Sequence, residues 1–269
     1  MMRSLKSLLQ RPAPAVAPRA AAPDRPAPDR AVYVVGDLHG RADLLEQMLE
    51  LIDADVGRTR ARNPHLVFVG DYVDRGPDSA GVLDRLHDLA SELPENVTCL
   101  MGNHDRMMLD FLADPVIRGA RWLRSGALPT LQSFELPSET LPKTPTPTPT
   151  PEILIELATL LKSNLTAEKY GWLSDLPLSW SSGNLWVVHA AADPQHRMEQ
   201  QNPRTLLWGH PEFETRPRAD GVWVAHGHYQ VDTPVFDQGR IATDTGAWHS
   251  GRLTACAIRP DGSHRFLQT

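Results

Sequence analysis

Carboxylate, imidazole and guanidinium side chains gather in three short segments of this sequence, and each segment directly follows an apolar run. The longest is Gly70–Ser79, in which Asp71, Asp74 and Arg75 lie close together. The apolar residues before it are typical of a buried strand, and Gly76-Pro77 is typical of a turn before a helix. Because ligands of α/β proteins bind where parallel strands end, two carboxylates and an arginine at this point indicate a metal ion and an anion held together.

The same order of residue types recurs twice elsewhere in the chain. Asp37 and His39 follow one apolar run, and Asn103 and His104 follow another. This mixture of oxygen and nitrogen donors suits Mn, Fe or Zn better than Ca, which prefers oxygen ligands alone. If the three strands are neighbours, their ends bring all these donors to one point above the sheet.

Length and charge limit the classes of protein to consider. The chain has 269 residues, a formal net charge of −6 and 41% hydrophobic residues. This length suffices for one sizeable α/β domain or two small ones. No long basic stripe is present, which argues against broad nucleic-acid binding. No apolar run approaches the length of a transmembrane helix, so no membrane partner is expected.

The cysteines indicate the compartment. Cys99 and Cys256 both lie in apolar runs, so free and buried thiols are expected rather than a disulfide framework. A reducing compartment fits this usage. The apolar stretch near the first residue is short and interrupted, unlike a signal peptide. We therefore expect a cytoplasmic protein.

Proline marks two segments outside the expected core. Residues 1–30 are rich in Pro, Ala and Arg and are predicted to be a disordered tail. The repeated Thr-Pro pairs at 142–151 favour an extended polyproline spacer. The spacer lies within residues 118–175, which are predicted to form a helical cap inserted between the two halves of the site. The domain itself is expected to span residues 31–269.

Apolar periodicity predicts the local structure. It favours a helix at 42–52, a polar loop at 53–64 and a helix that begins near Arg106. Strand–helix units fill the first half of the chain, and strand candidates dominate from Leu185 onwards. Strands after such units favour a second sheet packed against the first. The predicted fold class is therefore α/β, a two-sheet β-sandwich flanked by helices.

At this point the three polar segments can be compared with known motifs. The sequences GDLHG, GDYVDRG and GNHD resemble the three signature motifs of the calcineurin-like metallophosphoesterases. The intact GDYVDRG resembles the phosphoprotein phosphatase branch, including bacterial serine/threonine protein phosphatases. The similarity covers roughly residues 32 to 258 and implies the same two-sheet sandwich with outer helices.

The resemblance implies two divalent metal ions, with Mn²⁺ expected and Fe or Zn as alternatives. One carboxylate, Asp71, would bridge them and offset the repulsion between cations roughly 3.5–4 Å apart. The implied ligands are Asp37, His39 and Asp71 for the first ion, and Asp71, Asn103, His189 and His228 for the second. His226 remains an alternative to His228, because both histidines belong to one His-Gly-His sequence.

The resemblance also implies a catalytic group. His104 would protonate the leaving oxygen and Asp74 would orient it, which suits an imidazolium near neutral pH. Arg75 would hold two phosphate oxygens. A hydroxide activated by both ions would be the nucleophile.

Two departures from the usual motifs bear on the substrate. Asp105 stands where phosphatases usually have glutamate; hydrolases of diadenosine tetraphosphate (Ap4A) have aspartate there, but they lack the aspartate present here as Asp74. His210 stands where bacterial members usually have arginine. Candidate replacements for that arginine are Arg204, Arg216 and Arg218.

Three functions are compatible with these residues. The leading hypothesis is a metal-dependent phosphomonoesterase for phosphoserine and phosphothreonine in proteins, extending to phosphotyrosine, and Asp74 favours it. The alternative is a pyrophosphohydrolase of dinucleoside polyphosphates or RNA 5′ ends, which Asp105 favours. The third is an inactive phosphopeptide-binding module, which the complete set of donors disfavours. The expected partner is a phosphorylated protein or a small phosphoester.

Overall fold

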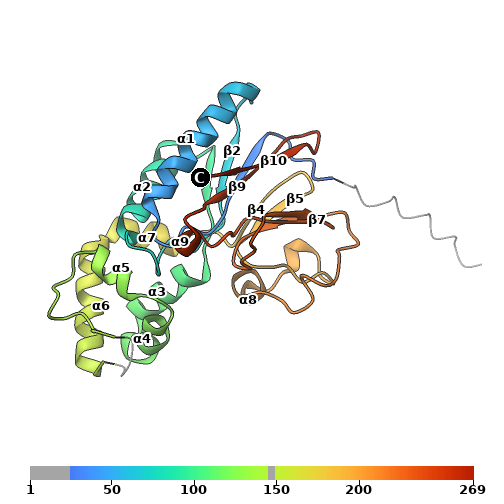
Figure 1. Cartoon of the computed structure of the whole chain (residues 1–269). Helices are drawn as coiled ribbons and strands as arrows, with labels where there is room; N and C mark the ends of the chain where they lie inside the picture. Colours follow the sequence, from blue (N-terminus) through green and yellow to red (C-terminus); the bar gives the residue numbers. More distant parts are fainter. Residues whose placement is uncertain (1–24, 145–148) are drawn as a thin grey trace, which may run out of the picture.

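Two five-stranded sheets form the centre of the molecule, and helices flank them (Figure 1). The computed structural model describes residues 25–144 and 149–269. The strand order is β10-β9-β1-β2-β3 in the first sheet and β4-β5-β6-β8-β7 in the second. This arrangement confirms the predicted two-sheet sandwich with outer helices.

The first sheet is parallel at its centre. Strands β1, β2 and β3 run parallel, and β9 and β10 add an antiparallel edge. All four residues of β1 are buried, because the sheet is covered on both faces. The strand bounds are Val32–Val35 for β1, His65–Phe68 for β2, Val97–Cys99 for β3, Thr254–Ile258 for β9 and His264–Gln268 for β10.

The second sheet is built from the later strands. Strands β5, β6 and β8 are parallel, with β4 and β7 antiparallel at the edges. The parallel strands of this sheet end on the same side of the molecule as those of the first. The bounds are Ser179–Ser182 for β4, Leu185–Val188 for β5, Trp223–His226 for β6, Val235–Asp237 for β7 and Arg240–Ala242 for β8.

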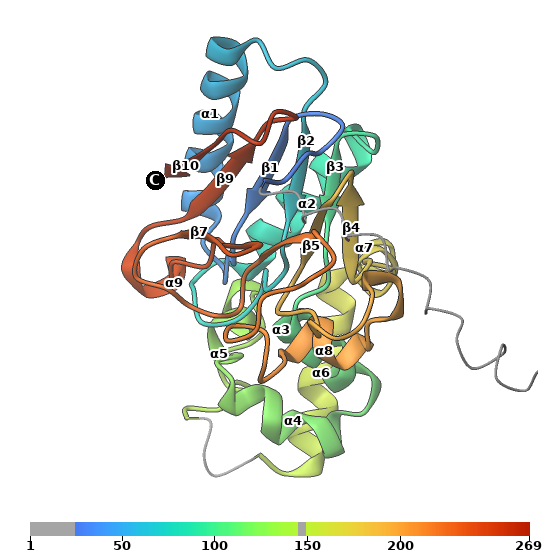
Figure 2. The same ribbon diagram turned by 90° about the vertical axis from the view of Figure 1, so that its right-hand side faces the viewer.

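The helices divide into three groups. Helices α1 (Ala42–Thr59) and α2 (Ser79–Glu92) connect the first strands and cover the outer face of their sheet. Helices α3 to α7 follow β3, and α4, α5 and α6 lie at the lower end of the molecule in both Figure 1 and Figure 2. The remaining bounds are Asn103–Ala113 (α3), Pro115–Arg124 (α4), Leu128–Ser133 (α5), Pro151–Leu165 (α6), Ala167–Ser174 (α7), Pro203–Trp208 (α8) and Ala247–Ser250 (α9), with a 3-10 turn at Met198–Gln200.

Apolar side chains fill the space between the sheets. Val34, Val67 and Leu100 from the first sheet and its edge pack with Val187 and Ile241 from the second, and all five are fully buried. Each such side chain contributes about 1.5–3 kcal/mol on burial. The packed sheets therefore supply the rigid support on which the loops at the strand ends rest.

Helix α1 is longer than predicted. The expected loop at 53–64 is wrong over its first part, since α1 continues to Thr59. The reason is the buried residue Asp55. Its carboxylate accepts a hydrogen bond from the Tyr33 hydroxyl at 2.8 Å and forms an ion pair with Arg265 at 2.8 Å. A polar residue with such distant partners gives no apolar periodicity to detect.

Helix α3 begins earlier than predicted, at Asn103 rather than near Arg106. Its N-terminus is fixed by Asp105, whose Oδ2 accepts the main-chain N–H of Gly102 at 2.9 Å. Asn103 and His104 therefore lie on the first turn of a helix and not on a loop beyond a strand.

The proline-rich segments are described in part. Residues 1–24 of the expected tail and residues 145–148 of the expected spacer lie outside the described residues. Residues 25–30 lie against the domain: the Ala27 main-chain N–H reaches Asn184 Oδ1 at 2.5 Å, and Arg30 donates to the Glu95 carbonyl at 2.9 Å. Ordered contacts thus begin before the predicted boundary at residue 31. No helix within the described part is both long and apolar enough to cross a membrane.

His65 links this entry segment to the first sheet. Arg30 Nη2 lies 2.6 Å from His65 Nδ1, and His65 Nε2 lies 2.9 Å from Thr98 Oγ1. Since a guanidinium can only donate, Nδ1 accepts and Nε2 carries the hydrogen. Burial, with the Arg30 charge, lowers the pKa of His65 from 6.5 to about 4. The folded protein therefore holds this histidine neutral.

We predict that His65 makes stability depend on pH. Its contribution is complete above pH 6.5 and is lost as pH falls towards 4, because the unfolded chain takes up the proton first. His65→Gln keeps both hydrogen bonds without a titrating group. Urea unfolding between pH 7.5 and 4.5 should show a steeper loss in the natural protein, by at most about 1.4 kcal/mol per pH unit. Parallel pH profiles for both proteins would contradict this role.

Candidate active site

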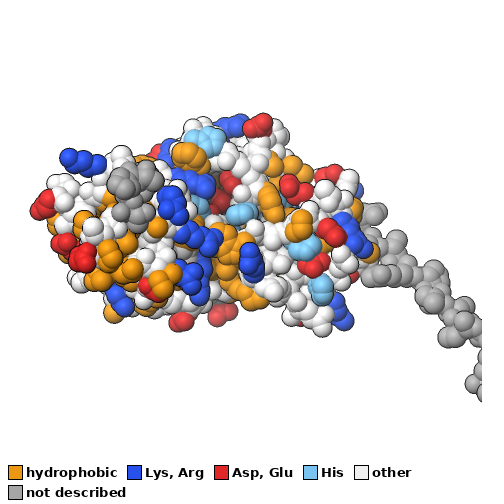
Figure 3. Space-filling model, turned by 90° about the horizontal axis from the view of Figure 1, so that it is seen from below, with side chains coloured by type: hydrophobic (Ala, Val, Ile, Leu, Met, Phe, Trp, Pro, Cys, Tyr) orange, Lys and Arg blue, Asp and Glu red, His pale blue; other side chains and the backbone are white. Residues whose placement is uncertain are grey.

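The candidate donors meet where parallel strands of both sheets end. Loops after β1 and β2 carry Asp37, His39 and Asp71, and α3 begins directly after the β3 strand region. His189 follows β5, and His228 lies two residues beyond β6. Figure 3 shows acidic and histidine side chains in a hollow near the middle of the face seen from below, with Lys and Arg beside it.

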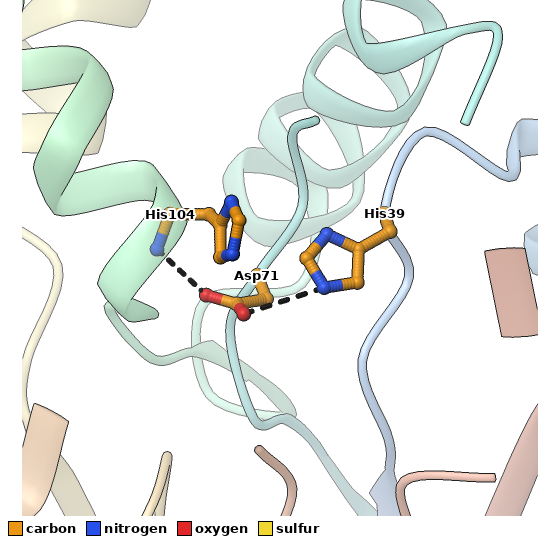
Figure 4. Close-up of side chains that lie close together, drawn as sticks. All are labelled: His39, Asp71 and His104. Carbon is orange, nitrogen blue, oxygen red and sulfur yellow. Dashed lines mark hydrogen bonds and ion pairs between the residues drawn. The ribbon is translucent and has the colours of Figure 1, made fainter. Parts of the chain in front are cut away.

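The first group of donors lies around Asp71. His39 Nε2 lies 3.4 Å from Asp71 Oδ2, and the main-chain N–H of His104 donates to Oδ1 (Figure 4). His39 Nδ1 lies 2.8 Å from the Val73 carbonyl. The carbonyl can only accept, so Nδ1 carries the hydrogen and the Nε2 lone pair faces the site. Burial lowers the pKa of His39 to about 3. This imidazole is therefore neutral and oriented as a metal ligand requires.

The second group of donors lies around Asp71 Oδ1. His189 Nε2 lies 3.4 Å from Asp71 Oδ1, and His189 Nδ1 lies 3.0 Å from the Val69 carbonyl. Asn103 Oδ1 lies between the two histidines, 2.9 Å from His189 Nε2 and 2.8 Å from His228 Nδ1. Asp71, His189 and His228 offer donor atoms within 4.8 Å of one another. Asp71 is therefore positioned to serve both groups.

His104 lies near the first group of predicted ligands. His39, Asp71 and His104 offer atoms within 4.8 Å of one another, and Asp37 stays a predicted ligand of the same ion. Asp37 is buried beside them, and its carboxylate accepts the main-chain N–H of His228 at 3.2 Å. His104 thus lies close enough to Asp71 for either of two roles, metal ligand or proton donor.

The charges at the site fit divalent cations. Burial, with the nearby Asp244 and Asp71 carboxylates, raises the pKa of Asp37 well above its usual range. Burial also lowers the pKa of His189 and, to about 4, that of His228. Crowded carboxylates beside neutral imidazole lone pairs lack positive charge, and bound metal ions would supply it.

His104 and Asp74 form a buried pair. His104 Nδ1 lies 2.7 Å from Asp74 Oδ2. Burial alone would lower the pKa of His104, but the Asp71 and Asp74 carboxylates outweigh it and the pKa is raised. Asp74 is fixed by Trp122 Nε1 at 3.1 Å and by the Thr130 hydroxyl at 2.9 Å. In this structure Nδ1 carries the hydrogen towards Asp74, because Arg75 donates to Nε2. The raised pKa favours a second proton at Nε2 once Arg75 no longer donates to it.

Arg75 extends over both donor histidines near Asp71. Its Nη1 lies 3.0 Å from His39 Nε2 and its Nη2 lies 3.1 Å from His104 Nε2. The guanidinium also lies 5.6 Å from the ring centre of Trp248. The side chain is exposed, so an anion entering the hollow can reach it.

The backbone is strained at this site. Five residues other than glycine have positive φ angles: His39 at 43°, Asp71 at 54°, Asp74 at 75°, Arg75 at 70° and His228 at 59°. Such conformations cost on the order of 1–3 kcal/mol each and are kept where function requires them. The surrounding hydrogen bonds thus hold these side chains in positions that a relaxed loop would not adopt.

Sequence reasoning missed residues that reach the site from distant parts of the chain. Asp244, after β8, lies beside Asp37, and its position after a strand was the signal available. Thr130 and the indole nitrogen of Trp122 hold Asp74, and no pattern in the sequence indicates this. His226, the alternative ligand, has its Nδ1 2.9 Å from its neighbour's carbonyl and its ring against Phe213.

Two of the three candidate replacement arginines are already paired. Arg216 binds Glu212 at 3.0 Å, and Arg218 binds Asp220 and two main-chain carbonyls. His210 Nε2 lies 3.5 Å from Asp193. Arg204 is therefore the arginine of this set that is best able to meet an anion.

Asp105 organises the backbone around Asp71. Its Oδ2 accepts the main-chain N–H groups of Gly102 and Asp71, and its Oδ1 accepts that of Tyr72, each at 2.9 Å. An aspartate at this position thus has a structural role irrespective of the substrate.

We predict that Asp105→Asn lowers both kcat/KM and metal affinity. The new NH2 group would replace one of the two accepting oxygens and so face the N–H of Tyr72, or those of Gly102 and Asp71. The lost hydrogen bonds should loosen Asp71, a change that typically costs about 10–100-fold. Asp110→Asn, on the exposed side of the same helix, is the matched control. Elemental analysis and steady-state kinetics measure the two effects. Normal values for both quantities in Asp105→Asn would show that Asp105 does not position Asp71.

Comparison with known proteins agrees with this geometry. The family model described as calcineurin-like phosphoesterase matches residues 31–230. The symmetrical bis(5'-nucleosyl)-tetraphosphatase of Legionella pneumophila is 40% identical over 267 residues, covering 84% of this chain and 93% of that protein. The asymmetrical bis(5'-nucleosyl)-tetraphosphatase PrpE of Oceanobacillus iheyensis is 26% identical over 247 residues, covering 83% of this chain and 87% of that protein.

Other similarities are shorter or structural. Serine/threonine-protein phosphatase 1 of Salmonella typhimurium is 37% identical over 97 residues, covering 36% of this chain and 39% of that protein. The crystal structure of a proposed diadenosine tetraphosphatase has a TM-score of 0.58 at 21% identity, covering 90% of this chain and 95% of that one. It shows the same fold. The family model covers most of this chain, and the strand ends of the chain carry these donors. The chain therefore belongs to the calcineurin-like phosphoesterases.

Proposed function

We propose that this phosphoesterase hydrolyses the phosphoric anhydride chain of dinucleoside polyphosphates such as Ap4A. The observation that carries this proposal is similarity over most of the chain to two bis(5'-nucleosyl)-tetraphosphatases, against a match of 36% of the chain for serine/threonine-protein phosphatase 1. This order reverses the one favoured by the sequence motifs, in which a protein phosphatase came first. Hydrolysis of phosphoserine and phosphothreonine remains the second candidate.

Two divalent ions occupy the site in this proposal. Mn²⁺ is preferred, with Fe and Zn as alternatives, because imidazole and carboxylate donors are mixed. Bound there, the ions supply a polarised phosphoryl oxygen and an activated water. The residues that hold them are Asp37, His39, Asp71, Asn103, His189 and His228.

The protein's own residues bind and orient the reacting phosphate. Arg75 leaves His39 and His104 to hold two phosphate oxygens with its two terminal nitrogens. His104 Nε2 then gives a proton to the leaving oxygen, and Asp74 keeps the ring in the required orientation. Positioning and charge stabilisation account for most of phosphoryl transfer.

The rest of the organisation is proposed as follows. Residues 118–175 act as a cap over one side of the site, supported by the contacts of Trp122 and Thr130 with Asp74. Residues 31–269 form the catalytic domain. The protein works in the cytoplasm, which is supported by two free, buried cysteines.

One observation, the His104–Asp74 pair, favours the protein phosphatase candidate. A serine alkoxide is a poor leaving group and needs a proton, and the buried His104–Asp74 pair at 2.7 Å is well suited to give one. A nucleotide leaves as a more stable phosphate anion and needs this proton less. The same pair therefore serves both reactions to different degrees.

The decisive experiment compares Ap4A with a phosphoserine peptide in the presence of Mn²⁺. We predict that kcat/KM is higher for Ap4A by at least about tenfold, worth about 1.4 kcal/mol of barrier. Chromatography of the products identifies the bond that is cut: two ADP indicate symmetrical cleavage, and ATP with AMP indicates asymmetrical cleavage. A preference for the peptide would overturn the proposal and favour the second candidate.

His104→Asn is the informative variant for this comparison. As a proton donor, His104 should matter by about 10²–10⁴-fold on the phosphoserine peptide. The loss should be smaller on Ap4A and smallest on nitrophenyl phosphate, whose leaving group is a stable anion. Metal content should stay normal. Equal losses on all three substrates with a lost metal equivalent would make His104 a ligand instead.

A separate prediction concerns the shared carboxylate. Asp71→Asn should lose both metal ions, because one amide oxygen cannot serve the two groups that Asp71 Oδ1 and Oδ2 now serve. His189→Asn should lose only one, since it belongs to the second group alone. Elemental analysis after dialysis measures both variants. Two retained equivalents in Asp71→Asn would show that the carboxylate does not bridge.

A further inference from the structure

We propose that a cavity between α4 and α8 is a second subsite, which binds a terminal nucleobase of the dinucleoside polyphosphate. This deepens the proposed function and rests on it. Trp208, Arg121 and Arg204 line the cavity, which has a volume of about 220 Å³. That is smaller than the roughly 300–1,000 Å³ of a site enclosing a whole drug-sized ligand, and suits a single ring system.

The lining of the cavity combines an aromatic face with positive charge. The Arg121 guanidinium lies 4.3 Å from the ring centre of Trp208, which is only partly buried. Since Arg121 already lies over the ring, a base would stack on the Trp208–Arg121 pair, because nucleobases stack on guanidinium planes as well as on aromatic rings. Guanidinium groups also bind phosphate oxygens. The cavity thus matches a base and the phosphate next to it.

Arg204 supplies a positive charge that forms no ion pair within the described residues. Among residues 25–144 and 149–269, its guanidinium has no hydrogen-bond or ion-pair partner, whereas Arg216 is paired with Glu212 and Arg218 with Asp220. Figure 3 shows Lys and Arg side chains in a line beside the hollow that holds the acidic and histidine groups. Positive side chains beside the candidate site would attract a polyphosphate that extends from it.

Both walls of the cavity connect directly to the candidate active site. Arg121 precedes Trp122, whose indole nitrogen holds Asp74. Trp208 is two residues before His210, whose main-chain N–H donates to the Tyr229 hydroxyl at 3.1 Å. The Tyr229 ring in turn lies 5.3 Å from that of His228. Both walls of the cavity are thus linked to the donor residues through packed side chains.

The test measures product-like inhibition, so that it does not require turnover of Ap4A. ADP and inorganic pyrophosphate are compared as inhibitors of nitrophenyl phosphate hydrolysis by the full chain. Trp208→Ala should raise the ratio of Ki for ADP to Ki for pyrophosphate by about tenfold, because it removes a stacking face. Trp208→Phe should restore most of the ratio. An unchanged ratio in Trp208→Ala would overturn the subsite.

A surface variant keeps the test valid if Trp208→Ala folds poorly. Arg204→Gln should raise the Ki for ADP about tenfold, the loss of a hydrogen bond to a charged group, whereas Arg216→Gln should not. Equal effects of these two variants would contradict the assignment of Arg204.

The subsite and the proposed function fail in distinguishable ways. If the natural protein does not hydrolyse Ap4A but its inhibition by ADP depends on Trp208, the function is wrong and the nucleotide subsite stands. If Ap4A is hydrolysed with a KM that Trp208→Ala does not change, the function stands and the subsite is wrong.

Discussion

One buried carboxylate, that of Asp71, is shared by the two groups of donors, and much of the surrounding structure keeps it in place. Its two oxygens face His39 and His189, and Oδ1 also accepts the main-chain N–H of His104 at 2.9 Å. The residue sits in the left-handed region, which favours glycine. A side chain at position 102 would clash, since a Cβ there would lie 2.0 Å from the Asp71 nitrogen. The glycine of GNHD is therefore required by this close approach.

Local sequence was sufficient to predict the parts of the site that each strand end carries. The short polar segments follow buried strands, and parallel strands must deliver them to one edge. The two-sheet class, its parallel strands and the position of His189 and His228 after the later strands all follow from this pattern. The ends of helices were predicted less well where one buried residue sets them through contacts with distant parts of the chain. Asp55 extends α1 through Tyr33 and Arg265, and Asp105 starts α3 through the backbone of another loop. Apolar periodicity carries no information about such contacts.

The helices after α3 contact the candidate site through Asp74. This carboxylate is fully buried and takes hydrogen bonds from the indole of Trp122 in α4 and the hydroxyl of Thr130 in α5. The main chain is also joined, because the Arg75 main-chain N–H donates to the Gly126 carbonyl at 2.9 Å. A substitution in α4 or α5 can thus alter the positions of Asp74 and Arg75 without touching a candidate metal ligand.

The metal centre itself discriminates little between an ester and an anhydride. In the proposed mechanism, both reactions would place a phosphoryl group between the same ions, and both would use Arg75 to neutralise charge. Two features of this chain would separate the reactions: the proton that His104 is proposed to donate, and the volume beyond the transferred phosphate. In a phosphoprotein that volume holds peptide, and in a dinucleoside polyphosphate it holds more phosphate and a base. The partly buried Trp208, with Arg121 4.3 Å from its ring centre, suits the second kind of ligand. If the proposed subsite holds, substrate choice rests on α4 and α8, where no metal-binding motif of the sequence points.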